Sequence, residues 1–497
     1  MAGCDMTRLM RCLWLPTSLP FLGVLVGACA PAAIALGGCE TTVALPGGPD
    51  ASADAMGDAT VGANDASPGA TNDAPANTND APVTSTDDAP GVMPSTNAGP
   101  LCSLPGSIQY FGGMRAVVGQ QPAGSPNLGF LTIPEGFCVH YFATVPNARQ
   151  LRVAPGGELF VASPSTPTTG GGPNSNPAIV VIPDDDNDGL GDTQVQFLAG
   201  NALASTQGLL FANGNFYYQS GTQILSMPYT SGTRVAPGPG SPAANVTIYT
   251  SSLHWPKAID ITDDGKTIYV GNGGDQDESC DTSRPFHGGI LSIDSSNPSG
   301  NAGGTPVAKG LRNPIALRCW RGHGTCFALE LAKDYTANEG GREKMIPIRD
   351  GDDWGFPCCA SQGLPYSGVN PTPDCSAITP DTDSFMIGDT PFGVDFTPDT
   401  WPAPFADSAI VTRHGAAGTW TGARVTAIAM DPTTGSALPA TSVDGSNAGA
   451  MTDFATGWDD GTLSHGRPAA VAMAPDGRLF LSNDITGVIV WIAPLSM

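Results

Sequence analysis

An acidic loop is the clearest candidate for chemistry in the sequence. Its possible ligands are Asp184, Asp186, Asp188 and Asp192. Carboxylates that alternate around a glycine, here Gly189, suit a hard cation such as Ca²⁺. The spacing differs from that of an EF-hand, because no Glu occupies position twelve. The loop is therefore either a cation site that braces the fold or an acidic surface turn.

A second group of candidates lies in the last third of the chain. Arg413 and His414 end the β-rich run 406–412, and Trp420 follows shortly after. We predict that these three side chains contact a substrate, although aromatic residues at such positions also often pack in a core. The motifs Gly-x-Ser-x-Gly and His-Glu-x-x-His of familiar hydrolases are missing.

A repeated pattern must position these candidates. A turn containing Gly, often beside Asp or Asn, precedes a short β-rich run that ends in small or polar residues. The clear copies cover 155–163, 263–272 and 475–483, and the weaker copies cover 213–218, 324–330 and 406–412. The segment before a clear copy is also apolar, so each copy is predicted to be a hairpin of two inner strands.

The number of copies predicts the fold. Six copies at intervals of about 50 to 80 residues match four-stranded blades, so we predict an all-β, six-bladed β-propeller over residues 101–497. The polar ends of the inner strands converge on a central channel in such a fold, and a site is expected there. A β-sandwich or two smaller β domains are the alternatives.

Composition excludes one class of function. Only 13% of the residues are charged and the formal net charge is -25. Electrostatic binding to nucleic acid needs clustered Lys and Arg, so no nucleic-acid partner is expected. The chain has 64 Gly and 46 Pro and shows no long apolar period of 3.6 residues, which favours short strands joined by turns.

The N-terminus predicts export. Arg8 and Arg11 precede the apolar stretch 13–36, and small residues lead to Cys39. This pattern is typical of a lipoprotein signal over residues 1–39, in which Cys39 is acylated and anchors the protein to a membrane. Cys29 is a second candidate, and an ordinary cleaved signal or a membrane helix is the alternative. We expect a periplasmic or cell-surface lipoprotein.

Residues 40–100 are predicted to be a disordered tether. The segment is rich in Asp, Ala and Pro and has no Lys or Arg from residue 43 onward. Its apolar side chains are too few to offset the entropy of ordering. Repulsion between its carboxylates would hold the folded part away from the membrane.

The cysteines predict disulfides. Eight Cys follow residue 100, an even number in an exported domain. Metal binding is the weaker interpretation, because paired Cys-x-x-Cys units do not occur. Proximity along the chain suggests Cys102–Cys138 and Cys319–Cys326.

Several ordered segments carry a family resemblance. They are Ile133–Phe142 with Pro146–Leu151, His254 with Ala258–Val270, Gly310–Pro314, Gly351–Pro357, Thr390–Phe396, Arg413–Gly415 and Gly466–Pro468. Their order from about residue 130 to residue 495 resembles the soluble quinoprotein glucose/sorbosone dehydrogenase family. The resemblance implies a six-bladed propeller that uses pyrroloquinoline quinone (PQQ), with the first of these segments in its first blade.

The resemblance also implies roles for single residues. His254 holds the position of the base that accepts the sugar's hydroxyl proton, and His is the usual base near neutral pH. Arg312 and Asn313 match residues that contact the quinone, and a guanidinium suits its carboxylates. Gln150 matches a first-blade residue that lines the site. A structural hydrogen bond for His254 and loop bracing for Arg312 are the alternatives.

One segment departs from the family pattern. The family's cofactor calcium is held partly by the backbone of a Gly-Pro pair, whereas this chain reads Glu330-Leu-Ala-Lys-Asp334 there. Lys333 faces the acidic cofactor in one interpretation and solvent in the other. Leu253 also stands before His254, where the family carries a polar residue.

Two functions are therefore considered. The first is an envelope-anchored oxidoreductase that oxidises an aldose or a related polyol with PQQ and Ca²⁺ and passes electrons to an acceptor that the sequence does not identify. The second is a non-catalytic propeller that binds carbohydrate or a protein partner. The fold alone does not separate them, because function depends on the site.

Overall fold

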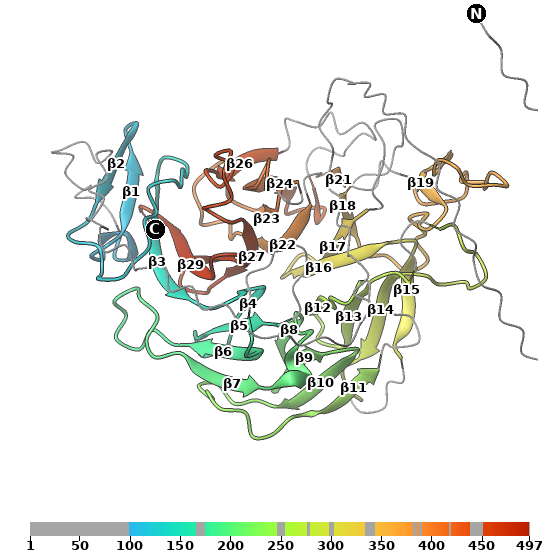
Figure 1. Cartoon of the computed structure of the whole chain (residues 1–497), viewed down its shortest axis with the longest axis horizontal. Coiled ribbons are helices and arrows are strands. Elements are labelled where there is room, and N and C mark those ends of the chain that lie inside the picture. The colour runs from blue at the N-terminus through green and yellow to red at the C-terminus, as the bar shows by residue number, and fades with distance from the viewer. Residues whose placement is uncertain are drawn as a thin grey trace, which may run out of the picture. The chain divides into compact units, whose positions relative to one another are not determined.

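The computed structural model of the chain shows an all-β protein. The residues that the structure describes are 99–165, 174–245, 254–275, 279–297, 303–332, 343–380, 385–386, 390–416, 419–437 and 451–496. Within them, six antiparallel sheets stand around a common centre, which confirms the predicted six-bladed propeller (Figure 1). Cys39, Lys333, the signal segment and nearly all of the tether lie outside the described residues.

Each blade has an inner, a second, a third and an outer strand. Blade 1 contains β4 (Gln150–Val153), β5 (Leu159–Ser163), β6 (Ala178–Ile182) and β7 (Val195–Ala199). Blade 2 contains β8 (Leu209–Ala212), β9 (Asn215–Ser220), β10 (Gln223–Pro228) and β11 (Ser241–Asn245). Blade 3 contains β12 (Ile259–Ile261), β13 (Thr267–Asn272), β14 (Gly289–Asp294) and β15 (Thr305–Lys309).

The remaining blades follow the same order. Blade 4 contains β16 (Asn313–Trp320), β17 (Thr325–Leu331), β18 (Lys344–Pro347) and β21 (Phe385–Met386). Blade 5 contains β22 (Pro391–Phe396), β23 (Ser408–Arg413) and β24 (Arg424–Asp431), with β25 (Ser436–Ala437) and β26 (Met451–Ala455) both paired to β24. Blade 6 contains β27 (Pro468–Met473), β28 (Leu479–Asn483), β29 (Val488–Pro494) and β3 (Phe137–Thr144).

A few short elements lie outside the blades. β1 (Ile108–Phe111) and β2 (Met114–Val117) extend the sheet of blade 6 beyond β3. β19 (Cys359–Ser361) and β20 (Leu364–Pro365) form a separate hairpin. The 3-10 helices are η1 (Leu101–Ser103) and η2 (Asn201–Leu203). Among the described residues no helix has the length and apolarity to cross a membrane.

The turn of each inner hairpin explains the sequence repeat. In five blades a glycine in the left-handed region precedes the second strand: Gly157, Gly214, Gly265, Gly324 and Gly477. Blade 5 uses Asp407 instead, with a φ of 47°. A left-handed residue suits a tight hairpin turn, and Gly, Asn and Asp adopt it at the least cost. All six copies of the repeat are therefore inner hairpins, as predicted.

The core lies between neighbouring blades. Every residue of β22 and of β23 is buried, and so is every residue of β5 and β28. Both faces of these strands pack against other blades, which is why their apolar residues lie on both faces and do not alternate strictly with polar ones. The inner strands contact one another in the ring order β4, β8, β12, β16, β22, β27 (Figure 1).

The two ends of the chain close the ring together. β3, from the start of the folded part, pairs with β29 from its end, and His140 lies opposite Trp491. Their rings stack with centroids 5.0 Å apart. The resemblance placed residues 133–151 in the first blade. The structure corrects this, because β3 belongs to blade 6 and only β4 belongs to blade 1.

Four disulfides occur among the described residues. Cys102–Cys138 and Cys319–Cys326 confirm the two predicted pairs. The other two are Cys280–Cys358 and Cys359–Cys375. Cys102–Cys138 ties η1 to the closing strand β3, and so it supports the seam of the ring.

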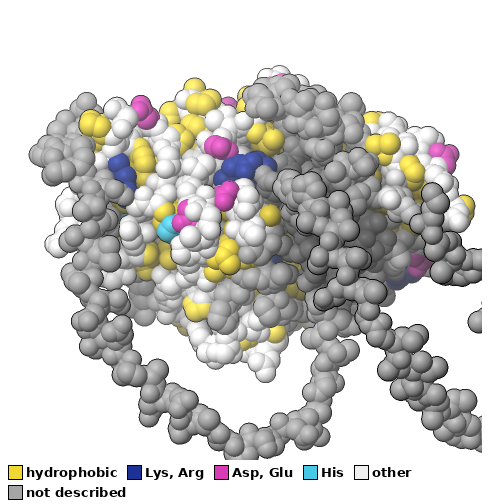
Figure 2. All heavy atoms as spheres, turned by 45° about the horizontal axis from the view of Figure 1, so that its top comes forward, with side chains coloured by type: hydrophobic (Ala, Val, Ile, Leu, Met, Phe, Trp, Pro, Cys, Tyr) yellow, Lys and Arg dark blue, Asp and Glu magenta, His cyan; other side chains and the backbone are white. Residues whose placement is uncertain are grey.

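The surface carries few charges of either sign. On the face drawn in Figure 2, the largest group of Lys and Arg side chains lies between acidic side chains. A nucleic-acid site needs a continuous basic patch, and this face has none among the described residues.

Removing the closing disulfide should destabilise the protein more than removing the hairpin disulfide. Cys102–Cys138 spans 36 residues and Cys319–Cys326 spans 7. If loop closure in the unfolded chain dominates, the double Ser variants lose about 4 and about 2 kcal/mol of unfolding free energy, respectively. Denaturant unfolding of both variants measures this. A larger loss for the hairpin disulfide would contradict the loop-closure account.

Candidate functional site

Three predicted site residues from three blades lie at one end of the channel. The inner and second strands of a blade are antiparallel, so the start of the first and the end of the second lie at the same end. Gln150 starts β4, Asn313 starts β16 and Arg413 ends β23. We call this end of the channel the near mouth. Sequence reasoning thus placed these three residues at a common end from three different blades.

Gly274 joins two of the predicted residues. Its carbonyl oxygen lies 2.8 Å from His254 Nδ1, and its N–H donates to Arg312 O at 2.6 Å. A Cβ at this position would lie 2.8 Å from Phe356 Cε1 and 3.1 Å from Arg312 O. Only a glycine therefore fits between the blade-3 loop and the start of blade 4. The structure brings His254 and Arg312 together through this one backbone unit.

The contact with Gly274 orients the His254 ring. A carbonyl oxygen only accepts hydrogen bonds, so Nδ1 must carry the proton. In the neutral imidazole the lone pair is then on Nε2, which is the arrangement that a general base needs. The side chain is 2% exposed, so the surrounding structure fixes this geometry.

Arg312 is fixed by the second strand of its own blade. Its backbone N–H donates to Glu330 Oε1 at 2.9 Å, and its Nη1 donates to Ala332 O at 3.2 Å. Both Arg312 and Glu330 are buried. The segment that departs from the family pattern therefore begins beside the predicted cofactor residue, and its continuation, residues 333–342, lies outside the described residues.

Several buried polar atoms at the near mouth lack a hydrogen-bond partner among the described residues. They are Gln150 Oε1, Gln207 Oε1, Asn313 Oδ1, Trp255 Nε1, His287 Nε2 and His414 Nε2. Each such atom costs about 1–3 kcal/mol when it stays unpaired. Unpaired polar atoms from several blades at one mouth are what a site for a polar ligand would leave.

A buried carboxylate organises the blade 5 and blade 6 side of the near mouth. Asp484 Oδ2 lies 2.6 Å from Arg149 Nη1, and Asp484 Oδ1 lies 3.0 Å from Arg467 Nε. His414 Nε2 lies 3.8 Å from the same carboxylate. Two guanidinium groups thus share one negative charge away from solvent.

Aromatic rings cover these guanidinium groups. Arg149 lies 3.9 Å above the Phe392 ring, which stacks on His414 with centroids 3.8 Å apart. Arg467 lies 4.2 Å above the Trp420 ring. Trp420 is also buried in the core, so one of its faces is already occupied. Its predicted contact with a sugar stays a prediction, as do those of Arg413 and His414.

Burial and charge set the protonation states here. Burial alone would raise the pKa of Asp484, but Arg467, His414 and Arg149 outweigh it and hold the pKa well below its usual range. Burial, with Arg467 and Arg149, holds the pKa of His414 well below 6.5, so this imidazole is neutral at pH 7. Burial also lowers the pKa of Lys257 to about 7. Lys257 Nζ donates to His254 O at 3.2 Å.

The near mouth has more buried cations than buried carboxylates. We count the charged side chains of the described residues at this end of each blade. These are the two residues before each inner strand and the residues within two positions of the last residue of each second strand. The buried guanidinium groups are those of Arg149, Arg312, Arg413 and Arg467, beside Lys257 with its pKa of about 7, and the buried carboxylates are Glu330 and Asp484. Such an excess favours a ligand with acidic groups.

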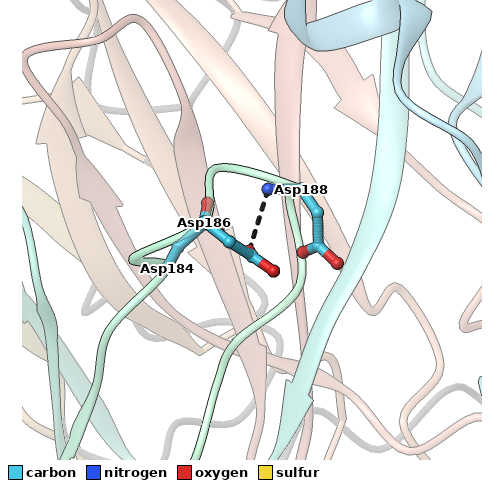
Figure 3. A group of neighbouring side chains, drawn as sticks. All are labelled: Asp184, Asp186 and Asp188. Atoms are coloured by element: carbon cyan, nitrogen blue, oxygen red, sulfur yellow. Dashed lines mark hydrogen bonds between the residues drawn. The ribbon is translucent and has the colours of Figure 1, made fainter.

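The acidic loop lies at the other end of blade 1. One ligand atom each of Asp184, Asp186 and Asp188 lies within 4.8 Å of the others, and no ion is present. The Asp186 and Asp188 carboxylates point to the same side of the loop, and Asp188 N–H donates to Asp186 (Figure 3). Asp184 pairs with Arg478 at 2.5 Å. Asp192 is outside the group and accepts from the backbone of Asp185.

The same loop bridges two blades. Trp491 Nε1 donates to Gly189 O at 2.8 Å, and Arg478 also belongs to blade 6. The loop joins β6 and β7 of blade 1. It therefore braces the seam between the first and last blades even without a cation.

Sequence reasoning missed part of the near mouth. Arg149, Lys257, Arg467 and Asp484 were not predicted as site residues. The available signal was their place in the repeat, because Arg149 and Arg467 stand directly before inner strands and Asp484 directly follows a second strand.

Comparison with solved structures shows the same fold. The AA12 carbohydrate-active enzyme of Trichoderma reesei superposes with a TM-score of 0.60 at 16% identity, over 73% of this chain and 97% of that one. The PQQ domain of pyranose dehydrogenase from Coprinopsis cinerea gives 0.61 at 16%, over 75% and 99%. The soluble aldose sugar dehydrogenase of Escherichia coli gives 0.50 at 12%, over 72% and 99%.

Sequence comparison adds no closer relative. No family model and no curated protein matches the chain. At these identities the structural likeness shows the fold, and it agrees with the propeller implied by the family resemblance.

Replacing Asp484 by Asn should destabilise the protein strongly. Arg149 and Arg467 would stay buried beside a neutral group, which costs about 3–5 kcal/mol at pH 7. The carboxylate's contribution is present above the unfolded pKa of 3.8 and is lost as the pH falls through the lower folded value. The difference from wild type should therefore shrink below about pH 4.

Denaturant unfolding at several pH values measures this difference. Asp476→Asn is the matched control, because Asp476 is 44% exposed in a hairpin turn. Equal losses for the two variants, or a difference that grows in acid, would contradict the role of Asp484.

Proposed function

We propose that the protein is a quinoprotein-type oxidoreductase that oxidises an aldose or a related polyol at the near mouth with PQQ. The observation that carries this proposal is the Gly274 bridge, which fixes His254 and Arg312 side by side. The solved structures with this fold include a PQQ domain of a pyranose dehydrogenase and an aldose sugar dehydrogenase, which supports the same class of substrate.

The residues of the near mouth fit the cofactor. PQQ carries carboxylates and carbonyl oxygens, and the buried guanidinium groups of Arg312, Arg413 and Arg467 are suited to such groups. The unpaired oxygens of Gln150 and Asn313 can accept from an N–H or O–H of the cofactor or the sugar. In this proposal Arg312, Asn313 and Gln150 hold the cofactor, and Arg413 and His414 face the substrate.

His254 supplies the acid–base chemistry. A bound quinone would supply the acceptor for a hydride from the sugar carbon, and Ca²⁺ would supply a Lewis acid for its carbonyl. His254 Nε2 takes the proton of the sugar's hydroxyl, because Nδ1 is already committed to Gly274 O. The Gly274 carbonyl then stabilises the imidazolium, since Nδ1–H stays hydrogen-bonded to it throughout.

Cation binding by the acidic loop is a separate part of the proposal. The loop is at the opposite end of blade 1 from Gln150, so a Ca²⁺ ion there would brace the seam and not act on the substrate. Asp186 and Asp188 are its best ligands, because Asp184 already pairs with Arg478. A role for Lys333 toward the cofactor rests on the sequence alone.

The cellular location is likewise a proposal from sequence. The small residues before Cys39 and the acidic segment 40–100 support a lipid anchor followed by a tether. In that arrangement the propeller would act in the periplasm or at the cell surface. The physiological electron acceptor would have to reach it there.

Replacing His254 by Gln should remove turnover. The purified full chain is mixed with PQQ and Ca²⁺, and aldoses are added with a redox dye as acceptor. We expect dye reduction by the wild type and a kcat about 10²–10⁴ times lower for His254→Gln, because the proton acceptor is lost. His323→Gln is the matched control, since His323 lies at the other end of the channel.

Two results would decide against the proposal. If His254→Gln keeps full turnover, His254 is not the base. If the wild type reduces no dye and shows no change in cofactor absorbance but still binds sugar, the non-catalytic binding propeller is the better interpretation.

Calcium should raise the thermal stability through the acidic loop. We expect millimolar CaCl₂ to raise the melting temperature of the wild type and not that of Asp186→Asn/Asp188→Asn, because these carboxylates supply the free ligand oxygens. Without calcium the two proteins should melt alike, and Asp294→Asn, in a blade 3 turn, should respond as the wild type does. An equal calcium response in the double variant would exclude the loop as the site.

A further inference from the structure

A large pocket lined by described residues lies at the other end of the channel. It has a volume of about 810 Å³, which is within the usual range for small-molecule sites. Its walls come from the ends of β16, β22 and β27 and from the turns that follow them, and Arg152 of β4 also lines it. We call this end the far mouth. Nothing in the proposed oxidation uses it.

Side chains separate the far mouth from the near mouth. Arg152 Nε donates to Leu209 O at 2.8 Å and its Nη2 donates to Ile259 O at 3.0 Å, so its guanidinium joins blades 1, 2 and 3. Gln207 Nε2 donates to Ile315 O at 2.7 Å and links blade 2 to blade 4. Polar bridges thus cross the channel, and a ligand at the far mouth would not compete with one beside His254.

The floor of the pocket offers unused hydrogen-bond donors. Arg318 binds Asp395 through Nε, at 2.7 Å, and through Nη2. Nη1 of Arg318 and Nη1 of Arg152 have no hydrogen-bond partner among the described residues, and neither atom is enclosed by protein. Both side chains are nearly buried, with exposures of 14% and 8%. Two guanidinium groups therefore present donors to the interior of the pocket.

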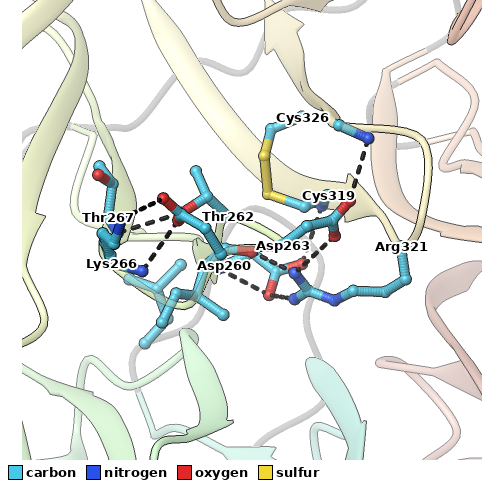
Figure 4. The surroundings of a disulfide bond; sticks show 12 residues. Asp260, Thr262, Asp263, Lys266, Thr267, Cys319, Arg321 and Cys326 are labelled. Carbon is cyan, nitrogen blue, oxygen red and sulfur yellow. Dashed lines mark hydrogen bonds and ion pairs between the residues drawn. A yellow bond between two sulfur atoms is a disulfide. The ribbon is translucent and has the colours of Figure 1, made fainter.

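The charge of the floor favours an anion. The guanidinium groups of Arg152, Arg318 and Arg321 share the two buried carboxylates Asp260 and Asp395. Figure 4 shows Arg321 directed at Asp260 and at Asp263, the latter nearer to solvent and 3.8 Å away. Burial, opposed by Arg321, raises the pKa of Asp260 to about 6, so at pH 7 this carboxylate is mostly ionised and balances part of the charge of Arg152 and Arg321.

The rim of the pocket has the opposite character. Asp399 and Asp407 carry carboxylates without a hydrogen-bond partner among the described residues, and Thr400 is exposed beside them. His323 stacks on Trp320 with centroids 3.7 Å apart, and its Nδ1 contacts Pro432 O. Carboxylates accept hydrogen bonds from hydroxyl groups, and they repel a second anionic group.

We propose that the far mouth binds a hydroxylated monocarboxylate, that is, a sugar acid, with its carboxylate on Arg152 and Arg318 and its hydroxyls on Asp399 and Asp407. A simple carboxylate would leave the rim acceptors unused. A neutral polyol would leave the floor donors without an anion. A polyanion would meet the rim carboxylates. The site is independent of the proposed oxidation.

Three probes separate the parts of this proposal. Calorimetric titration of the full chain uses sodium D-gluconate, D-glucitol, which has the hydroxyls without the carboxylate, and butyrate, which has the carboxylate without the hydroxyls. We expect gluconate to bind at least about tenfold more tightly than either control, since hydrogen bonds to a charged group are roughly twice as strong as those between neutral groups. If glucitol binds as tightly as gluconate, the guanidinium groups of the floor have no role in binding. If butyrate binds as tightly as gluconate, the carboxylates of the rim have no role.

Two variants locate the site. Thr400→Trp places a large side chain on the rim and should weaken gluconate binding at least about tenfold without lowering the melting temperature. Thr452→Trp, on the exposed side of β26, is the matched control and should bind as the wild type does. Arg318→Lys, which keeps the charge but loses the guanidinium fork, should also weaken binding.

The outcomes distinguish this site from the near mouth. If Thr400→Trp loses gluconate binding while His254→Gln keeps the wild-type affinity for gluconate, the result supports binding at the far mouth. Loss in His254→Gln with full binding in Thr400→Trp places the ligand at the near mouth and overturns the proposal. Absence of gluconate binding to the wild type at about 10 mM, which is tenfold above a dissociation constant of about 1 mM, overturns it as well.

Discussion

The pairing of β3 with β29 is the constraint on which the rest of the structure depends. Inner strands stand around a channel only if the ring closes, and here the two ends of the folded chain supply neighbouring strands of blade 6. Three further contacts secure the seam: the Cys102–Cys138 disulfide, the stack of His140 on Trp491, and the acidic loop bound to Trp491. They come from segments far apart in sequence. Local hairpins therefore form the blades, but long-range contacts set the geometry of both mouths.

The near mouth is costly to build. Desolvation of the buried cations and of Asp484, together with several polar atoms without partners, opposes folding, and the apolar packing between blades must offset this cost. Proteins usually keep such an arrangement where a ligand uses it. The unpaired oxygens of Gln150 and Asn313 and the buried cations come from different blades. The glycine at 274 serves the same purpose, because it lets His254 and the start of β16 approach through one peptide unit.

The sequence could predict the hairpins that the repeat determines, but few of the contacts between them. The turn glycines and the apolar runs predicted all six inner hairpins, and the order of short segments pointed to His254 and Arg312. The Asp484 network could not be found in this way, because Arg149 and Asp484 are 335 positions apart and no motif links the two. The same reason explains the misplaced first segment: residues 137–144 look like the start of a blade, but their partner is the last strand of the chain. Composition could not show that Arg467 covers Trp420 either.

The two mouths differ in how their charges are paired, and this difference limits what each can bind. At the near mouth two guanidinium groups share Asp484 and aromatic rings cover them, so their orientation is fixed before any ligand arrives. Pre-organised donors lose little entropy on binding and suit a reaction that needs fixed geometry. At the far mouth Arg318 is held by Asp395 and Arg152 by backbone carbonyls, and both side chains line an open pocket with Nη1 unused by the described residues. That arrangement suits reversible recognition of a small ligand. Because polar bridges cross the channel between the mouths, one propeller can hold two chemically different sites.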